Sequence, residues 1–435
     1  MGWSSDEPQT KKKGMETSSK ILLAIIACLV LIIILILVLL MNIEKTTYTI
    51  NVDGQTITTV TKDTLLKRED NITYVNIEEF AKLVKYEYHE GEYKAYTIEN
   101  NKCYVQGTNE TASFYLNVSK IFKLPINELE KEYEEYIVEN PVKEFNGKMY
   151  ASIDAIGIAF NVQITEKEQS LTVFALDYLV TWYDAKVKEW GYTGIADLSF
   201  ENKKAILYDR FIVKKENGLY KIIDSAQKEI VSDKYKEIEF SELTKEFFVT
   251  NNLSQVGIIN LDGTTKIEPI YNSISVFDKE KDLYLIQKDT KYGVMKSGNI
   301  TILKPEYEAI GCNITSVEIN GVKKTVSPVV TIDKCNGIVV KKDDKYGIIT
   351  IEGNVIVPIQ VDSIYSIKNE KGEIKYYMIY NNKELNIIDM LIEQGIIEKT
   401  DDIKDKEEVR NEIKNQNTLN QIDNSISNNS VNTVQ

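Results

Sequence analysis

The spacing of hydrophobic positions changes several times along the 435-residue chain. Residues 21–41 are uninterruptedly apolar, residues 46–178 mix strand-like alternation with two short helical stretches, and residues 195–390 carry short alternating runs between turn residues. Residues 398–435 are charged and then rich in Asn and Ser, which predicts a charged helix and a disordered tail. The predicted fold class is therefore mixed: one transmembrane helix, a small duplicated α+β module, and an all-β repeat array that is propeller-like or, alternatively, an open β-solenoid.

The apolar run at 21–41 is long enough to cross a membrane. As a helix it spans about 30 Å, the thickness of a bilayer core. We interpret it as an uncleaved signal anchor, with processing or lipidation at Cys28 as the alternative. Four lysines precede the run: Lys11, Lys12, Lys13 and Lys20. They favour a cytoplasmic tail over 1–20 and place residues 42–435 outside the cytoplasm, in a single-pass protein of the cell membrane.

Residues 46–178 contain one pattern twice, at a constant offset that places Tyr74 in register with Tyr150. Each copy has a turn pair, a short strand through this tyrosine, a helix of about two turns, and a further strand or hairpin. The expected N-caps of the two helices are Asn76 and Ser152, each followed by an acidic residue in the first turn. The turn pairs are Asp70-Asn71 and Asn146-Gly147. We predict two related units whose helices are held by packing on the strands.

A second repeat fills residues 195–390. Its copies begin at Tyr220, Val256, Tyr292 and Tyr346, so the first two intervals are equal and the third is longer. At one fixed distance after these starts lie Tyr235, Tyr271, Tyr307 and Val361, and in three copies the start is followed by Gly257, Gly293 or Gly347. We interpret each copy as a hairpin that stacks on its neighbours, in which the glycine permits close backbone approach. Core packing by the tyrosines is favoured over a row that stacks on sugar rings.

The longer third interval indicates an insertion between Gly311 and Ile338. Cys312 and Cys335 bracket this insertion. In an oxidising setting outside the membrane the pair is a candidate disulfide, and two unpaired buried cysteines are the alternative. Cys103 has no evident partner in the sequence.

Composition limits the kinds of catalytic, metal and nucleic-acid-binding site that the chain can have. His89 is the only histidine, which excludes metal centres and catalytic relays that need two imidazoles. His89 with Glu87 and Glu90 is a weak metal hypothesis, and an exposed histidine at a hairpin end is the favoured alternative. The net charge of −14 argues against a nucleic-acid partner. We therefore expect no catalytic residue, no cofactor and no metal.

Two family resemblances follow from these motifs. Through Asn146-Gly147 with Tyr150, and the helix-then-strand pattern up to Phe174, residues 46–178 resemble the copper amine oxidase N-terminal-like domain of exported bacterial proteins. This resemblance implies a non-catalytic stalk or adhesion-like module. It does not imply the oxidase activity, since that chemistry needs three histidines at copper and an Asn-Tyr-Asp/Glu motif, which this sequence lacks.

Residues 195–390 resemble the WG (or KWG) repeat family. The residues that carry this resemblance are Gly257, Pro269 and Tyr271 in one copy, Tyr292, Gly293, Pro305 and Tyr307 in the next, and Tyr346, Gly347 and Pro358 in a third. The first copy departs from the pattern, with Lys221 in place of glycine, and a later copy has Val361 in place of tyrosine. The resemblance implies an all-β repeat with an interaction role and no general enzymatic one.

Together these patterns predict a non-enzymatic, membrane-anchored protein of a bacterial cell envelope. We expect it to bind or scaffold an extracytoplasmic protein or cell-wall polymer through its β-repeat region. An alternative is an envelope regulator or ligand sensor that signals through the membrane anchor, for which the 1–20 tail would need a partner. A third hypothesis is an enzyme with an unrecognised acid-based site.

Overall fold

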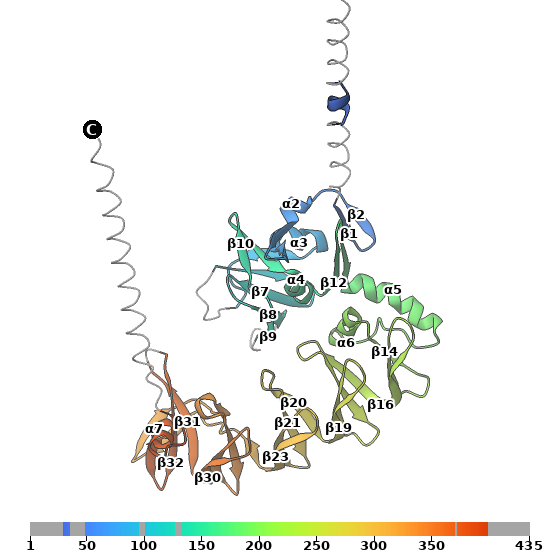
Figure 1. Ribbon diagram of the computed structural model, residues 1–435. Helices are drawn as coiled ribbons and strands as arrows, with labels where there is room; N and C mark the ends of the chain where they lie inside the picture. The colour runs from blue at the N-terminus through green and yellow to red at the C-terminus, as the bar shows by residue number, and fades with distance from the viewer. Residues whose placement is uncertain (1–28, 35–47, 95–100, 127–132, 370–371, 399–435) are drawn as a thin grey trace, which may run out of the picture. The chain divides into compact units, whose positions relative to one another are not determined.

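The computed structural model describes residues 29–34, 48–94, 101–126, 133–369 and 372–398 (Figure 1). Strands dominate these residues, and they form several separate sheets. The predicted mixed fold class is therefore wrong. Its α+β module contains far more strand than expected, because an additional five-stranded sheet lies between the two duplicated units.

The predicted transmembrane helix was part of that fold class. No helix in the described ranges is both long and apolar enough to cross a membrane. Within the run at 21–41 only residues 29–34 are described, as helix, and the rest of the run lies outside the described residues. The tail at 1–20 and nearly all of the segment at 398–435 also lie outside them.

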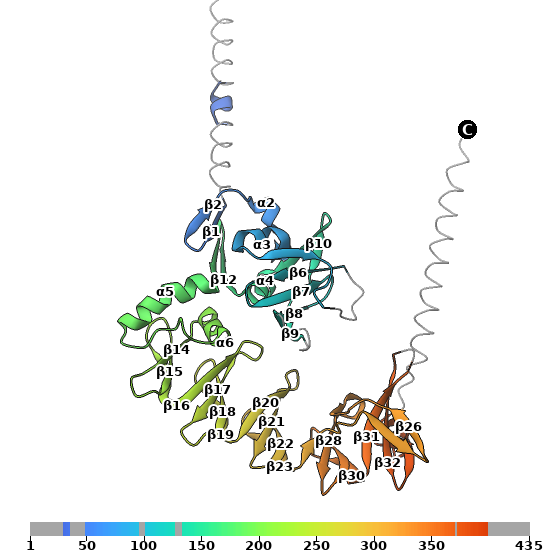
Figure 2. The ribbon, with the colours of Figure 1, turned by 180° about the vertical axis from the view of Figure 1, so that it is seen from behind.

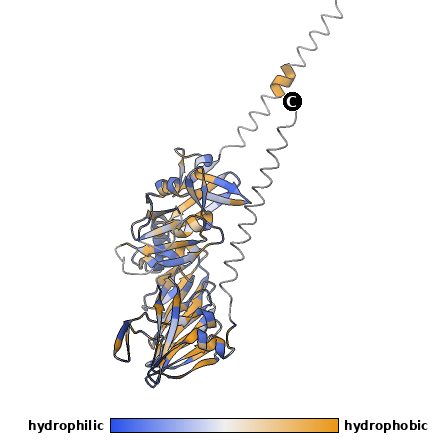
Figure 3. Ribbon diagram, turned by 90° about the vertical axis from the view of Figure 1, so that its left-hand side faces the viewer, coloured by the Kyte–Doolittle hydropathy of each residue, from blue (hydrophilic) through white to orange (hydrophobic). Residues whose placement is uncertain are grey.

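The chain divides into two compact units. The first comprises residues 1–252 with 259–264, and the second comprises residues 253–258 with 265–435, as far as each is described. Hydrophobic and hydrophilic residues both occur along the strands (Figure 3). Each unit has its own hydrophobic clusters, so we describe each unit by itself.

The duplicated pattern of the first unit folds as two copies with the same order of elements. They are β4 (Ile72–Asn76) and α3 (Ile77–Val84) in one copy, and β11 (Lys148–Ser152) and α4 (Ile153–Phe160) in the other. Each helix ends at a residue with a left-handed backbone, Lys85 or Asn161. Both predicted turn pairs also have positive φ angles, as tight hairpins require. The constant offset between the copies therefore holds element by element.

The two copies pair symmetrically through their central strands. In the antiparallel β4–β11 pair, Asn76 lies opposite Tyr150, Val75 opposite Ala151, and Tyr74 opposite Ser152. Val75 and Ala151 are equivalent residues of the two copies, so the pairing has a local two-fold character. β3 (Leu66–Glu69) and β10 (Lys143–Phe145) extend the sheet on its two sides.

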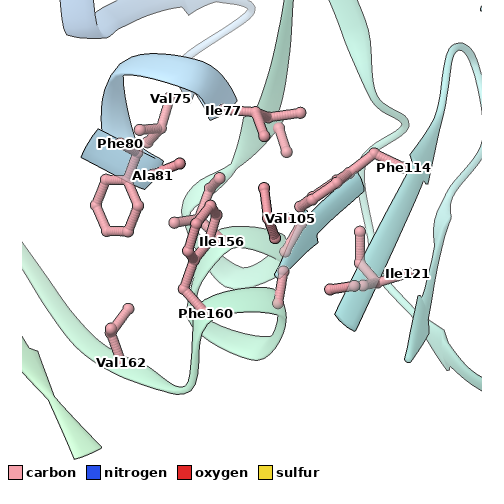
Figure 4. Close-up of a cluster of buried hydrophobic side chains, with 14 of the residues drawn as sticks. Val75, Ile77, Phe80, Ala81, Val105, Phe114, Ile121, Ile156, Phe160 and Val162 are labelled. Atoms are coloured by element: carbon pink, nitrogen blue, oxygen red, sulfur yellow. The ribbon is translucent and has the colours of Figure 1, made fainter. Parts of the chain in front are cut away.

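Two further sheets complete this module. One has the order β12-β13-β1-β2, formed by β12 (Val162–Lys167), β13 (Ser170–Ala175), β1 (Thr49–Val52) and β2 (Gln55–Ile57). The other runs in chain order through β5 (Glu87–Glu90), β6 (Lys102–Gln106), β7 (Glu110–Tyr115), β8 (Lys120–Pro125) and β9 (Glu134–Ile137). α2 (Lys62–Leu65) precedes β3. In the shared core, Phe80 of α3 meets Phe160 of α4 edge to face at 5.0 Å between ring centroids (Figure 4).

The first unit continues into helices and the first repeat strands. The elements are α5 (Leu176–Glu189), α6 (Phe200–Lys204), η1 (Ala205–Tyr208), β14 (Phe211–Lys214), β15 (Tyr220–Ile223), β16 (Glu229–Ser241) and β17 (Glu246–Asn251). The Asn202 side chain docks α6 on β16, since it donates to the Ile238 carbonyl at 3.0 Å and accepts from the Phe240 amide at 2.7 Å.

One repeat period in the second unit forms a complete four-stranded antiparallel sheet. Its strands, in spatial order, are β20 (Ser273–Asp278), β21 (Leu283–Lys288), β22 (Lys291–Lys296) and β23 (Ile300–Tyr307) (Figure 2). The hairpin expected from the sequence is the second half of this sheet, because the Tyr-Gly motif lies on β22 and the Pro-x-Tyr motif on β23.

The other elements repeat or vary this arrangement. They are β18 (Val256–Asn260), β19 (Thr265–Tyr271), β24 (Ala309–Ile310), β25 (Ser316–Ile319), β26 (Val322–Thr325), β27 (Thr331–Ile332), η2 (Asp333–Cys335), β28 (Gly337–Lys342), β29 (Lys345–Thr350), β30 (Val355–Val361), β31 (Ser363–Lys368), β32 (Ile374–Tyr380), β33 (Lys383–Asn386) and α7 (Ile387–Glu393). β24, β28, β29 and β30 form one period with the insertion after its first strand, and β31, β32 and β33 form the next.

Candidate functional site

The motif glycines of the β-repeat region lie against the backbone of the neighbouring fourth strand. A Cβ atom on Gly293 would approach the Leu303 carbonyl oxygen to 2.4 Å, and one on Gly257 would approach the Pro269 nitrogen to 2.7 Å. Gly347 is similarly close to Val357. The structure thus shows the close backbone approach expected from the sequence, and a side chain at these positions would force the strands apart.

A β-bulge explains this closeness. Tyr292 pairs with Tyr307 and Val294 pairs with Leu303, so β23 carries two more residues than β22 between the two pairs. Pro305 lies within this bulge, where its missing N–H costs no ladder hydrogen bond. β23 is also the last strand of its sheet, and a proline on such an edge hinders pairing with another strand. The glycine and the proline of the motif therefore both belong to this bulge.

The motif tyrosines serve packing. Tyr235, Tyr271 and Tyr307 are buried, and the Tyr271 hydroxyl lies 2.9 Å from the Met295 sulfur. Their positions agree with core packing rather than with a row that stacks on sugars. Tyr292 and Tyr346 are half-buried opposite Tyr307 and Val361. The β-strand pairing thus explains the fixed distance between the two motif positions, because it joins directly opposed residues of the third and fourth strands.

The insertion between Gly311 and Ile338 contains its own two-stranded sheet, β25–β26. Val317 and Val326 of this insertion pack on Tyr365 of β31, and Lys324 forms an ion pair with Glu384 of β33 at 2.7 Å. The insertion is therefore anchored on the following sheet.

The candidate disulfide is not formed in the structure. Cys312 and Cys335 are both free. Cys312 is buried and Cys335 is partly buried, and burial raises the pKa of both thiols. The structure thus has both thiols unpaired, and pairing in an oxidising setting stays a prediction. Cys103 is a third free, buried cysteine.

Exposed hydrophobic side chains mark part of the β-repeat surface. Val322 at the tip of the β25–β26 hairpin is 60% exposed, and Val330, later in the insertion, is 45% exposed. Ile300 and Val355, the first residues of two fourth strands, are 54% and 59% exposed. The insertion thus adds exposed apolar side chains to those that the regular repeats already carry.

His89 lies on β5, where its side chain contacts an aromatic ring and a carboxylate. Its ring stacks on Tyr104 at 4.6 Å between centroids, and its Nε2 lies 3.4 Å from a Glu87 oxygen. Within the described ranges, no group of three or more His, Cys, Asp or Glu residues is arranged to hold a metal ion.

A buried ion-pair network, which the sequence analysis missed, lies in the first unit. Glu110, Lys123, Lys204 and Glu242 are all less than a tenth exposed. Lys123 Nζ lies 2.9 Å from Glu110 Oε2 and 2.8 Å from Glu242 Oε2, while Lys204 Nζ lies 2.5 Å from Glu110 Oε1. The network joins β7 and β8 of the duplicated module to α6 and to the β16–β17 turn.

The electrostatics of this network favour the charged forms. Burial by itself raises the pKa of Glu110, but Lys123 and Lys204 outweigh burial and hold it at about 2. Burial alone would lower the pKa of Lys204, yet the adjacent carboxylates of Glu242 and Glu110 raise it above its usual range. No spacing in the sequence could have revealed the network, because its members come from distant segments: Lys123 and Glu242 alone are 119 positions apart.

Comparisons with known proteins agree with a β-repeat class. Residues 257–292 and 346–382 match the family model described as WG containing repeat. The C-terminal region therefore carries WG-type repeats, and the first matched segment runs from one motif glycine to the start of the next copy. The resemblance of residues 46–178 to the copper amine oxidase N-terminal-like domain stays a prediction. No curated protein matches the chain in sequence.

Similar solved structures include β-propellers, at low scores. The WD40 β-propeller domain of Doa1 is 5% identical, with 63% of this chain and 77% of that chain covered and a TM-score of 0.17. The Dos1 propeller is 9% identical, with 68% and 87% covered and a TM-score of 0.19. PorZ, a surface component of the type-IX secretion system of Porphyromonas gingivalis, is 7% identical, with 65% of this chain covered and a TM-score of 0.18. This chain spans 37% of the length of PorZ.

Proposed function

We propose that this chain is a non-catalytic binding or scaffold protein that recognises a protein or a cell-wall polymer through its β-repeat region. The observation that carries the proposal is the insertion at 312–336, which adds a separate hairpin with exposed Val322 and Val330 to one repeat. In repeat proteins, insertions into single repeats form loops on one face, which is often the binding face. The location outside the cytoplasm stays a prediction.

The fixed spacing of the repeat motif is explained by residues that stabilise the sheets, which are distinct from the exposed residues of the insertion. The motif residues pack within the sheets, since Gly293 and Pro305 lie at the bulge and Tyr307 is buried. Residues at the surface are therefore free to vary without disturbing the sheets. Val322 at the hairpin tip and Val330 are exposed, so both side chains are accessible to a partner.

Retention of the purified full-length chain on purified peptidoglycan tests the proposal, together with capture of crosslinked partners from envelopes. The test variant is Val322→Ser with Val330→Ser. Its matched control is Ile300→Ser with Val355→Ser, which removes apolar surface of similar exposure outside the insertion. We expect the test variant to lose about ten-fold in affinity for its target, and the control to keep it.

Two results would count against the proposal. One is the absence of any retention on peptidoglycan, combined with a set of crosslinked proteins that is the same for the native chain and the test variant. The other is an equal loss of binding in the test and control variants, which would place recognition outside the insertion. Equal far-ultraviolet circular dichroism spectra of all variants verify that each has folded.

A further inference from the structure

A cavity of 340 Å³ lies in the first unit, whereas the β-repeat insertion belongs to the second. It forms where the ends of α3 and α4 meet the start of α5. Residues from six separate segments line it, among them Asp53, Tyr86, Asn109, Glu110, Asn161 and Asp177. Its volume lies at the lower end of the about 300–1,000 Å³ that is typical of pockets for small ligands. The cavity therefore suits a small molecule rather than a polymer.

The inner wall of the cavity is polar and fixed in place. Glu110 and Asn161 are 7% and 4% exposed. The Asn161 amide nitrogen donates to Glu110 Oε2 at 3.2 Å, and its oxygen accepts from Lys123 Nζ at 2.8 Å. Because buried polar groups held in this way do not reorganise when a ligand arrives, they favour binding with a defined orientation.

The start of α5 supplies donors and acceptors together. The Ala175 amide donates to Asp53 Oδ1 at 2.8 Å and the Leu176 amide donates to the Asn161 carbonyl at 3.1 Å. The amides of Asp177 and Tyr178 also lie in the first turn of α5, where an amide has no acceptor within the helix, so both can donate to a ligand. The carboxylates of Asp53 and Asp177 lie in the same wall as acceptors.

Aromatic rings complete the lining. Tyr86 lies against the β6–β7 turn, where Gly107 leaves room for its ring, and its hydroxyl donates to the Phe160 carbonyl at 2.9 Å. Tyr178 and Phe200 lie at other points of the wall, and Lys204 Nζ covers one face of the Phe200 ring at 4.7 Å. Ring faces beside hydrogen-bonding groups suit ligands that have both C–H and hydroxyl surfaces.

The charges decide which class of ligand fits. Among the lining residues three acids, Asp53, Glu110 and Asp177, outnumber one cation, Lys85, so the wall disfavours an anion; Lys123 and Lys204, which pair with Glu110, do not line the cavity. A bare metal ion does not fit either, because the described acidic residues are not grouped closely enough to hold one. We propose that the cavity binds a neutral, hydroxyl-rich ligand of about one or two sugar rings. Its hydroxyl groups both donate and accept, as this wall requires.

Saturation-transfer NMR and calorimetry on the full-length chain test this site. The probes are maltose and N,N′-diacetylchitobiose as neutral saccharides and glucose 6-phosphate as an anionic one. Thr108→Trp places a large ring at the exposed mouth of the cavity, and Asp177→Asn removes one acceptor charge. Asp197→Asn is the matched control, since Asp197 is an exposed acid that does not line the cavity.

We expect at least one neutral saccharide to bind, with about a ten-fold loss of affinity for Thr108→Trp, a several-fold loss for Asp177→Asn and none for Asp197→Asn. Trp182 provides a fluorescence signal for binding, since its ring stacks on that of Tyr178, with 6.3 Å between the ring centroids. The absence of saturation transfer to either neutral probe would overturn the proposal, as would stronger binding of the anionic probe or full affinity in Thr108→Trp. The Val322→Ser and Val330→Ser variant should bind these saccharides normally, so this test and that of the β-repeat surface fail independently.

Discussion

In the duplicated module, two copies of a unit pair through β4 and β11, whereas the later part of the β-repeat region forms successive separate sheets: β20–β23, then β24 with β28–β30, then β31–β33. The first arrangement is symmetric, because Val75 faces its own equivalent, Ala151. A symmetric pair uses the same surface of both copies and leaves none for a third. In the second arrangement each copy contacts the copy before it and the copy after it through different surfaces. Further copies can therefore be added until a different element covers the last surface.

In this chain α7 ends the series. The segment 385–389 (LNIID) aligns with 346–350 (YGIIT) as a degenerate further copy, in which Asn386 occupies the position of the motif glycine. The Asn386 side chain accepts from the amides of Ile388 and Asp389 at 3.0 Å and 3.3 Å. The residue thus begins a helix at the point where the third strand would have continued. Ile387 and Leu391 of α7 are fully buried. The comparison shows that a head-to-tail array needs a terminal cap, which a symmetric pair does not need.

The two regions also differ in where they are vulnerable. The duplicated module depends on buried charges that connect it to α6, and the β-repeat region depends on glycines beside a bulge. These differences lead to four predictions, ordered by the size of the expected effect.

Trp182 and Trp190 lie in the first unit and residues 253–435 contain no tryptophan, so tryptophan fluorescence follows unfolding of the first unit.

The largest effect is expected from Lys204→Met. This substitution leaves Glu110 and Glu242 buried with one cation fewer, and breaking a buried ion pair typically costs about 3–5 kcal/mol. Urea unfolding followed by tryptophan fluorescence measures the loss. The control is Lys82→Met, because Lys82 is exposed and its ion pairs with Glu78 and Glu79 are worth about 0–1 kcal/mol. Equal effects of the two variants would show that the network does not stabilise the unit.

The second prediction concerns acid. The pKa of Glu110 is about 2 in the folded chain, against about 4.3 for an ordinary glutamate. A lowered pKa stabilises the folded state above the unfolded value, and this contribution of about 2–3 kcal/mol is lost as pH falls from about 4 to about 2. The difference in unfolding free energy between the native chain and Glu110→Gln should therefore shrink across this range. A difference that stays constant with pH would contradict the prediction.

The third prediction contrasts two glycines. Gly293→Ala should destabilise the second unit by about 1–3 kcal/mol, since the new methyl group meets the backbone of Leu303 and Pro305. Thermal unfolding followed by far-ultraviolet circular dichroism measures this loss. Gly157→Ala, in α4, should be neutral or stabilise the first unit by up to about 1 kcal/mol, because its Cβ makes only an ordinary contact at 3.4 Å and alanine favours the helix. A tolerated Gly293→Ala would mean that the bulge adjusts freely.

Local patterns in the sequence predicted what depends on local interactions. The constant offset between the duplicated copies located α3 and α4, and the fixed distance between the two motif positions located the opposed residues of the repeat hairpins. The five-stranded sheet β5–β9 was missed, because polar residues such as Lys123 suggest a solvent-exposed surface until their partners are known. Those partners, and the cavity beside them, come from distant segments, so only the folded chain brings them together.

The smallest predicted effect separates equivalent positions in the two symmetric copies. Asn76 and Ser152 are both N-caps and were both expected to act as such, but only the Asn76 side chain makes a capping bond, from the Glu79 amide at 3.1 Å. Asn76→Ala should therefore cost about 1 kcal/mol, as the loss of a helix cap usually does. In Ser152→Ala the lost hydroxyl is buried and has no hydrogen-bond partner among the described residues, so stability should hardly change.

The same urea titration with tryptophan fluorescence measures both variants. Asn76→Ser provides a further control, since serine can replace asparagine as a cap and should restore most of the loss. If Asn76→Ala and Ser152→Ala cost the same, the two caps act alike, and the symmetry of β4 and β11 extends to the helices that follow them. If only Asn76→Ala destabilises, the copies share their strand pairing but have diverged in how each helix begins.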